Sequence, residues 1–476
     1  MVLNGPDDPT LWITRALGYW ENQLFGNLDH TSNCNILMNT CIQSDHIDPA
    51  KLEKAVRALI YNQPNFRADV RKGEDGVIYF TPATDFSDVF EFIDQSGDTG
   101  GVTGYAGCWE LSEKLVNIPF SCGSGAPLHK TYLVKRPDCY MLLNRYHHGI
   151  GDGTTGFRII NEILRQYDLL VSGNDVNLSP AAVLISGEDM SMFVENDELV
   201  EKMIEGRMER VKVQEMLMPL NREELAASQA GNPWINKTLH AVGTVDGLTK
   251  LKALCKRSGV TVGCYSFAAL FYAVAAVHIK RKGGEFPEEG VPTLYTDVVA
   301  NLRSRVDPDP GDESFMLCIA EVETSEKITK ETTLLETAKK ISHQLKSCIE
   351  EKRFPLFAKY KEGVETGKQS EYFNSHPEGT YCEFLPSNQV GFKYPTKYSW
   401  GEMTSTHSLG SYWCPFGANQ VVLYHSVNGA LNYTTCCCDG DNNCKDAQEV
   451  QDLFVSVMEN ADRVNENTRV MDIVDF

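Results

Sequence analysis

The stretch Tyr-His-His-Gly-Ile-Gly-Asp-Gly-Thr-Thr-Gly, from Tyr146 to Gly156, decides how the fold is predicted. It follows the apolar segment 140–146, whose length and composition are typical of a buried strand. After it, apolar residues recur at helical spacing, namely Phe157, Ile160, Leu164 and Tyr167. The sequence therefore predicts a strand, a glycine-rich turn and a helix. The turn carries the residues that could take part in a reaction.

Two adjacent histidines are followed, four residues later, by an aspartate and a glycine: His147, His148, Asp152 and Gly153. A histidine at a strand end can present a ring nitrogen to a reacting hydroxyl or amine, and an imidazole suits a general base at neutral pH. The aspartate could order the loop through a salt bridge or backbone hydrogen bonds. The alternative interpretation is two core histidines and an aspartate that caps the next helix.

The same stretch also contains Gly151-x-Gly153-x-x-Gly156, a GxGxxG between a strand and a helix. A dinucleotide site would need this context and a second parallel strand that ends in an acidic residue about 20 positions later. Asp168 and Asp175 are only roughly placed for that role, and no clear strand follows the helix. The histidine interpretation is favoured, and the dinucleotide interpretation stays open as the alternative.

The chain on both sides predicts alternating strands and helices. A strand is expected at 35–43, a helix that begins at Asp48-Pro49, and a hairpin of strands at 128–134 and 140–146. A polar, glutamate-rich stretch covers 174–233. Beyond it we expect a buried helix after Val262, a strand at 294–300, a helix at 334–349 and further strands at 421–427 and 431–435.

The pattern His147-His148-x-x-x-Asp152-Gly153 resembles the HHxxxDG signature of the superfamily of chloramphenicol acetyltransferase, BAHD acyltransferases, condensation domains and alcohol acetyltransferases. Weaker similarities to the alcohol acetyltransferase branch extend along the chain. They are Arg15-x-Leu17-Gly18-x-x-Glu21, the segment Pro64-Asn65-Phe66-Arg67, Asn301-Leu302-Arg303 and Thr406-His407-Ser408-Leu409-Gly410. The DFGWG motif of BAHD enzymes is absent; Pro415-Phe416-Gly417 is the nearest stretch.

This resemblance implies an α/β fold with mixed α+β sheets, built as two chloramphenicol-acetyltransferase-like lobes with a tunnel between them. The expected organisation is an N-terminal lobe at 1–173, a connection at 174–233 and a C-terminal lobe at 234–476. The resemblance implies that His148 is the catalytic base and that Asp152 is structural, with Arg303 as our candidate for its ion-pair partner. His147 would be structural, and Gly153 and Ser408 are candidate oxyanion donors.

The implied activity is acyl transfer of the EC 2.3.1 type, from acyl-CoA, expected to be acetyl-CoA, to a hydroxyl group of a small molecule. No bound cofactor or metal is expected. Two alternatives remain open: amide formation by a condensation-type enzyme, and a non-catalytic binding protein of the same fold. The cationic residues that would meet CoA are not identified by the sequence; the run Lys280-Arg281-Lys282 is one source of positive charge.

Composition limits the partners and the compartment. The 476 residues carry 44 Lys and Arg against 65 Asp and Glu, a net charge of −21. This charge argues against sequence-independent binding of nucleic acid or of an anionic membrane. The first residues, MVLNGPDDPT, lack the basic stretch and apolar core of a secretory signal, so we expect a cytoplasmic monomer without a membrane span. The 15 cysteines are expected to be mostly free thiols, and a metal site at Cys436, Cys437, Cys438 and Cys444 is disfavoured by their spacing.

Overall fold

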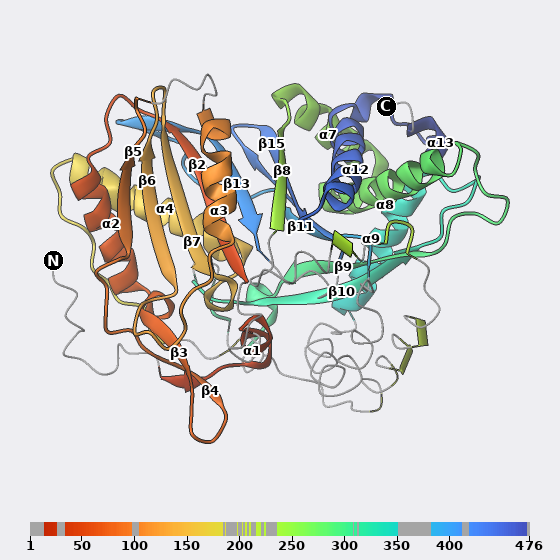
Figure 1. Ribbon diagram of the computed structural model, residues 1–476. Helices are drawn as coiled ribbons and strands as arrows, with labels where there is room; N and C mark the ends of the chain where they lie inside the picture. The colour runs from red at the N-terminus through yellow and green to blue at the C-terminus, as the bar shows by residue number, and fades with distance from the viewer. Residues whose placement is uncertain are drawn as a thin grey trace. The chain divides into compact units, whose positions relative to one another are not determined.

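Figure 1 shows the computed structural model, which describes residues 14–25, 34–97, 104–183, 236–307, 309–311, 314–350, 382–411 and 418–473, and scattered positions between 186 and 224. By their contacts the residues form two compact units. Unit 1 comprises Met1–Met192, Asn301–Ile319 and Phe392–Tyr412, and unit 2 comprises Phe193–Ala300, Ala320–Gly391 and Trp413–Phe476.

These units differ from the predicted lobes in one respect. The lobes were predicted as continuous stretches, whereas unit 1 also takes Asn301–Ile319 and Phe392–Tyr412 from the second half of the chain. The physical reason is that a strand in the later segment pairs with the sheet of unit 1, and Arg303 in the earlier one pairs with Asp152. Most of the predicted connection at 174–233 lies outside the described residues.

The main sheet of unit 1 has six strands in the order β12-β13-β2-β7-β6-β5. Their bounds are β2 (Asn35–Gln43), β5 (Phe90–Asp94), β6 (His129–Lys135), β7 (Tyr140–His147), β12 (Lys397–Tyr398) and β13 (Gly401–Gly410). All neighbours are antiparallel except β5 and β6, so the sheet is mixed. The predicted strands at 35–43, 128–134 and 140–146 are confirmed.

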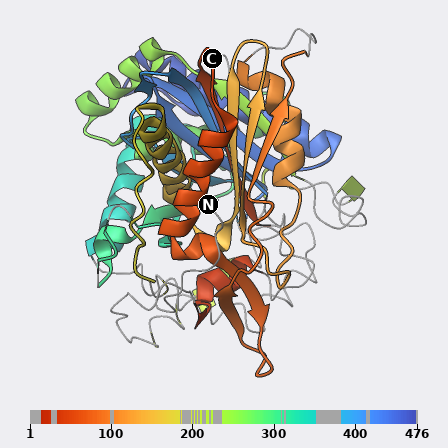
Figure 2. The same ribbon diagram turned by 90° about the vertical axis from the view of Figure 1, so that its left-hand side faces the viewer.

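Helices cover both faces of this sheet (Figures 1 and 2). They are α2 (Pro49–Asn62), α3 (Trp109–Val116) and α4 (Gly153–Val171). Side chains alternate across a strand, and Met38 and Leu142 accordingly belong to the apolar cluster with α2 and α4, while Leu37 and Leu143 belong to the cluster with α3. The helix α2 begins as predicted, because the Asp48 carboxylate accepts hydrogen bonds from two backbone N–H groups of its first turn.

A smaller sheet of unit 1 lies next to the end of β7. Its order is β1-β4-β3, and the bounds are β1 (Arg15–Ala16), β3 (Ala68–Lys72) and β4 (Ile78–Pro82). The short helix α1 (Tyr19–Leu24) follows β1 and contacts the 3-10 turn η5 (His148–Ile150) directly after β7. The other 3-10 turns of the unit are η3 (Pro64–Arg67), η4 (Gly104–Cys108) and η6 (Arg303–Arg305).

Unit 2 has a four-stranded sheet, β11-β14-β15-β8, and a two-stranded sheet, β10-β9. Its strands are β8 (Asn236–Val242), β9 (Leu294–Asn301), β10 (Ile319–Glu326), β11 (Leu385–Gln389), β14 (Gln420–Val427) and β15 (Ala430–Cys438). Its helices are α7 (Val245–Ser258), α8 (Val262–Arg281), α9 (Leu334–Glu350), α12 (Asp441–Glu459) and α13 (Val470–Ile473), with the 3-10 turn η7 (Ala461–Arg463).

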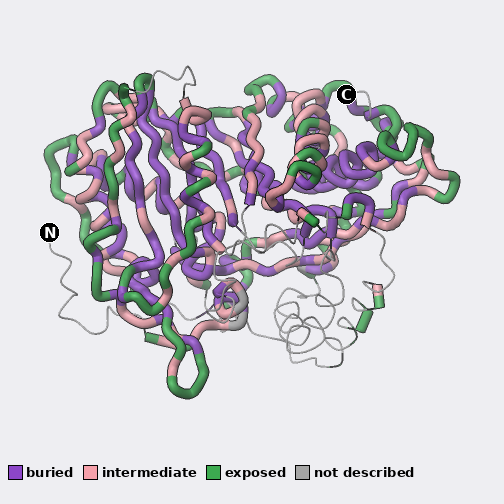
Figure 3. Tube along the Cα trace, viewed as in Figure 1, coloured by how far each residue is buried: buried purple, intermediate pink, exposed green. Residues whose placement is uncertain are grey.

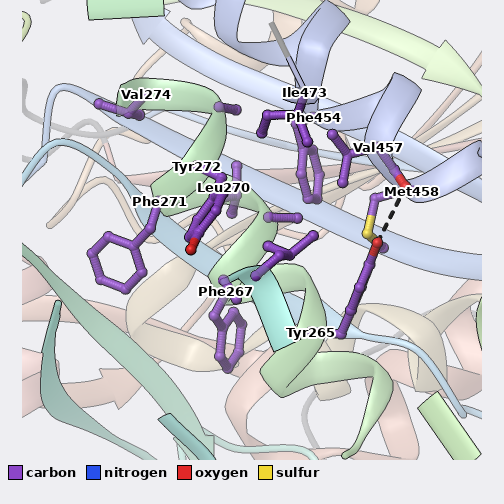
Figure 4. Close-up of a cluster of buried hydrophobic side chains, with 14 of the residues drawn as sticks. Tyr265, Phe267, Leu270, Phe271, Tyr272, Val274, Phe454, Val457, Met458 and Ile473 are labelled. Atoms are coloured by element: carbon purple, nitrogen blue, oxygen red, sulfur yellow. Dashed lines mark hydrogen bonds between the residues drawn. The ribbon is translucent and has the colours of Figure 1, made fainter. Parts of the chain in front are cut away.

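The helix α8 forms the centre of unit 2, as the burial colours of Figure 3 show. Figure 4 shows Tyr265 of α8 beside Val457 and Met458 of α12, with the Tyr265 hydroxyl donating to the carbonyl of Val457 at 3.4 Å. By length and composition α8 is the one described helix that could cross a membrane, but 89% of its apolar window is buried inside the protein. This burial is what a core helix requires, in agreement with the predicted buried helix after Val262.

Candidate active site

The loop that carries the two histidines, residues 147–153, is called the histidine loop and lies at the end of the central strand β7. The strand β7 ends at His147, η5 follows immediately, and α4 begins at Gly153. The Asp152 side chain caps α4 by accepting the N–H of Thr155 at 3.0 Å. The predicted order of strand, glycine-rich turn and helix is therefore confirmed, and the aspartate does cap the helix, as the alternative interpretation required.

The two histidines have different surroundings. His147 is completely buried, and its Nδ1 accepts the N–H of Gly149 at 3.0 Å. His148 is only partly buried, and its backbone N–H donates to the carbonyl of Cys34 at 2.7 Å. Of the pair, His148 is the imidazole with the greater access, and its role as catalytic base stays a prediction.

The predicted pair of Asp152 and Arg303 is present and buried, with side-chain exposures of 2% and 0%. Arg303 Nη1 donates to Asp152 Oδ2 at 2.8 Å, and Arg303 Nη2 donates to Asp152 Oδ1 at 3.2 Å. This bidentate pair fixes the guanidinium plane relative to the carboxylate plane. Burial alone would raise the pKa of Asp152. The charge and hydrogen bonds of Arg303, together with the N–H groups of Cys318 and Thr155, lower this pKa by more than burial raises it, so the net shift is downward. The carboxylate is held ionised.

Arg303 is anchored by more than this carboxylate. Its Nη2 donates to the carbonyl of Met316 at 2.7 Å, and its Nε donates to Ser314 Oγ at 3.1 Å. The Cys318 N–H completes the site by donating to Asp152 Oδ2 at 3.0 Å. The ion pair thus ties the histidine loop to the segment around residues 314–318, and sequence reasoning had found only its two charged members.

Two further residues of the loop were missed. The Tyr146 hydroxyl donates to the carbonyl of Asp152 at 2.9 Å, and the Thr155 hydroxyl donates to the carbonyl of Met316 at 3.0 Å. Both side chains are fully buried. The only sequence signal for a role of these two residues was their position beside the motif. Their hydrogen bonds depend on the three-dimensional path of the loop, which the sequence does not reveal.

The two oxyanion candidates lie at different places. Gly153 is the first residue of α4, next to Asp152, so its N–H belongs to the helix N-terminus at the loop. Ser408 pairs in register with Met38, and Met38 pairs with Asn144, whereas His147 pairs with Asn35. At about 3.3 Å per residue this offset is about 10 Å along the strand. The structure therefore does not bring Ser408 to the histidine loop, and Gly153 remains the better placed of the two.

The dinucleotide interpretation fails on topology. A dinucleotide fold needs a parallel strand next to β7 after the helix, but both neighbours of β7 are antiparallel to it. Asp168 lies inside α4 and accepts a hydrogen bond from Trp400, and Asp175 forms an exposed ion pair with Lys54. Neither acidic residue ends a strand of this sheet.

The cysteine group offers no metal site. Cys436, Cys437 and Cys444 are free thiols, and Cys438 is disulfide-bonded, which departs from the expectation of free thiols at that position. Within the described part of the chain, no group of three or more His, Cys, Asp or Glu side chains is arranged to hold a metal ion. Of the basic run at 280–282, Arg281 is engaged by Asp446 and Glu449, which reduces the charge available to a ligand.

Comparison with known proteins identifies the fold. No protein-family model matches the chain, and no curated protein sequence matches it. Solved structures do match over nearly the whole length, and several of them are condensation domains. The chain has the fold of condensation domains. The predicted mixed α/β class is thereby confirmed, and the likeness to this superfamily is borne out at the level of the fold, while the alcohol acetyltransferase branch stays a prediction.

Three of these structures illustrate the likeness. Polyketide synthase associated protein 5 from Mycobacterium tuberculosis has a TM-score of 0.65 and 14% identity, over 94% of this chain and 98% of that one. The first condensation domain of the CDA synthetase has a TM-score of 0.65 and 13% identity, over 97% and 98%. The condensation domain from Monacolin K polyketide synthase has a TM-score of 0.65 and 14% identity, over 96% and 99%.

Proposed function

We propose that this protein is an acyltransferase in which His148 acts as general base. The single observation that carries the proposal is the partly buried His148 imidazole on a loop locked by the buried Asp152–Arg303 pair. The fold shared with condensation domains supports acyl transfer as the reaction type. The proposed donor is an acyl-CoA thioester, with acetyl-CoA as the first to test, and the proposed acceptor is a small-molecule hydroxyl.

The proposed reaction needs one proton-transfer group and no covalent enzyme intermediate. His148 takes the proton from the acceptor hydroxyl as its oxygen attacks the thioester carbonyl. The tetrahedral intermediate then collapses, the carbon–sulfur bond breaks, and the imidazolium returns the proton to the leaving thiolate. Proton transfer of this kind contributes about 10²–10⁴-fold to a rate.

A loop that holds this imidazole must resist movement. A misplacement of about 1 Å can lower a rate by about 10²-fold, so a rigid anchor has a catalytic value of its own. The Asp152 carboxylate supplies such an anchor because each of its oxygens accepts from Arg303 and from a backbone N–H. Asp152 is a positioning residue in this mechanism, since its oxygens are fully occupied and none is left for a substrate.

The second candidate is amide formation. It is favoured by one observation, namely that several of the matching solved structures are condensation domains. In that reaction an amine replaces the hydroxyl, and His148 would accept the proton as nitrogen attacks the thioester. A protein that only binds a partner is the third candidate.

One experiment separates these functions. The purified protein is incubated with acetyl-CoA and with mixtures of alcohols or amines, and thiol release and product mass are followed. Release that depends on an alcohol supports O-acyl transfer, and release that depends on an amine supports the condensation type. Release without acceptor indicates hydrolysis. No release with any acyl-CoA or acyl-pantetheine donor would contradict the proposed function and favour the binding protein.

A further inference from the structure

The phenyl ring of Phe25 lies flat against the His147 imidazole. The two ring centroids are 3.9 Å apart and the planes differ by 6°. Both side chains are completely buried. Phe25 directly follows α1, so this stack joins the N-terminal part of the chain to the end of β7 within unit 1.

The same ring also lies against the turn after the histidines. A Cβ atom added to Gly149 would lie 2.3 Å from the Phe25 ring, far inside contact distance. Only a residue without a side chain fits there while Phe25 keeps its place. The Phe25 ring therefore contacts the residues on both sides of His148.

The hydrogen bond from Gly149 to His147 fixes the protonation of the buried ring. A backbone N–H can only donate, so the Nδ1 atom that accepts it must be unprotonated. His147 is therefore the neutral tautomer with its proton on Nε2, and Phe25 holds the plane in which Nδ1 meets Gly149.

The position of Phe25 is fixed in turn by the ion pair of Arg15 and Glu21. Arg15 donates to both oxygens of the buried Glu21 carboxylate, at 2.7 and 2.6 Å, and the Gly18 N–H donates to the same carboxylate at 2.8 Å. The Arg15 guanidinium lies 4.9 Å from the ring centroid of Phe80, and Phe80 meets Phe25 edge-on at 6.0 Å. This network gives the residues of the Arg15-x-x-Gly18-x-x-Glu21 pattern a physical role, which is to hold α1 against the loop.

We propose that Phe25 is a positioning residue that sets the orientation of His148 through His147 and Gly149. The inference rests on the proposed function. His148 lies between the two residues that the ring contacts. Its backbone N–H donates to the carbonyl of Cys34 at 2.7 Å, and its carbonyl accepts the N–H of Gly151 at 3.1 Å. Loss of the flat ring frees the His147 plane and the Gly149 turn together, and the imidazole of His148 moves with them.

The test uses two variants of Phe25 and one matched control. Phe25→Leu keeps an apolar side chain but removes the flat ring, and Phe25→Tyr keeps the ring. Phe271→Leu is the control, because Phe271 is equally buried in the core of unit 2 and belongs to no part of the loop. Turnover with acetyl-CoA and an active acceptor, unfolding temperature, and the His147 tautomer by long-range ¹H–¹⁵N NMR are measured for each.

The expected result is a fall in kcat of about 10²-fold for Phe25→Leu with KM changed less than about threefold. Phe25→Tyr keeps the wild-type kcat. Phe271→Leu also keeps the wild-type kcat, although its unfolding temperature falls as much as that of Phe25→Leu. In Phe25→Leu the His147 ring no longer shows the Nε2–H tautomer alone.

Two results would overturn the inference. One is a normal kcat and an unchanged His147 tautomer in Phe25→Leu. The other is an equal loss of kcat in the control, which would make the effect one of general stability. If the wild-type protein transfers no acyl group at all, the proposed function fails, but the NMR comparison still decides whether Phe25 fixes His147.

Discussion

The buried pair of Asp152 and Arg303 leads to a quantitative prediction for stability. Asp152→Asn leaves the Arg303 charge without its counter-ion, and Arg303→Gln leaves the Asp152 charge without its own. Because both side chains are at most 2% exposed, we expect each single change to destabilise unit 1 by about 3–5 kcal/mol. Arg303→Gln should be the more harmful, since it also removes the hydrogen bonds to Met316 and Ser314.

The double variant tests whether the two effects have one cause. If the residues form one unit, the double change costs about as much as Arg303→Gln alone, so the coupling energy equals the loss from Asp152→Asn, about 3–5 kcal/mol. Denaturant unfolding followed by circular dichroism and tryptophan fluorescence measures each free energy, and coincidence of the two signals checks for a single transition. If the two losses simply add, the pairing does not stabilise the loop and this reasoning is refuted.

The lowered pKa of Asp152 gives the same pair a pH dependence. The folded-state pKa lies below the ordinary value of about 3.9, so the stabilisation is fully present above that pH and is lost as pH falls through the folded-state value. Wild-type protein should therefore lose more stability between about pH 4 and pH 2 than Asp152→Asn does. An equal loss in both proteins would mean that another group dominates the acid transition.

The remaining predictions concern a glycine and a buried acid. Gly149→Ala should destabilise by about 1–3 kcal/mol in thermal unfolding because its Cβ meets an aromatic ring at 2.3 Å; Gly97→Ala, whose Cβ meets nothing within 4 Å, is the control, and equal effects would contradict the close packing. Burial raises the pKa of Glu383 to about 7. Stability should therefore fall by about 1.4 kcal/mol per pH unit between about pH 4.5 and 7, and Glu383→Gln should remove this slope; an unchanged slope in that variant would exclude Glu383 as its source.

Local sequence was sufficient for the central elements of unit 1, which are β2, α2, β6, β7 and α4. The strand β2 and the start of α2 at Asp48 followed from an apolar run and from a capping residue beside a proline. The strand β13 was not predicted. It pairs with β2 across more than 350 residues of chain, and no local pattern encodes such a pairing. For the same reason the two predicted lobes could not include the segments that complete unit 1.

The candidate site shows the same division between local and distant contacts. The roles of His148 and Asp152 were suggested by a short motif, and Arg303 was found through a second weak motif. Ser408 was expected near the loop, but the structure does not bring it there. Its distance from the loop is set by the register between strands, which local sequence does not reveal. Phe25 was missed because a ring stack between a helix end and a strand end leaves no spacing in the sequence.

The most direct test of the central claim is turnover by His148→Ala. The variant is compared with His46→Ala, which removes an exposed histidine far along the chain from the loop, and both must unfold at the wild-type temperature. Transfer of a labelled acetyl group from acetyl-CoA to an active acceptor is measured by product mass. We predict a fall of about 10²–10⁴-fold for His148→Ala and no change for His46→Ala. Near-normal transfer by His148→Ala would contradict the account.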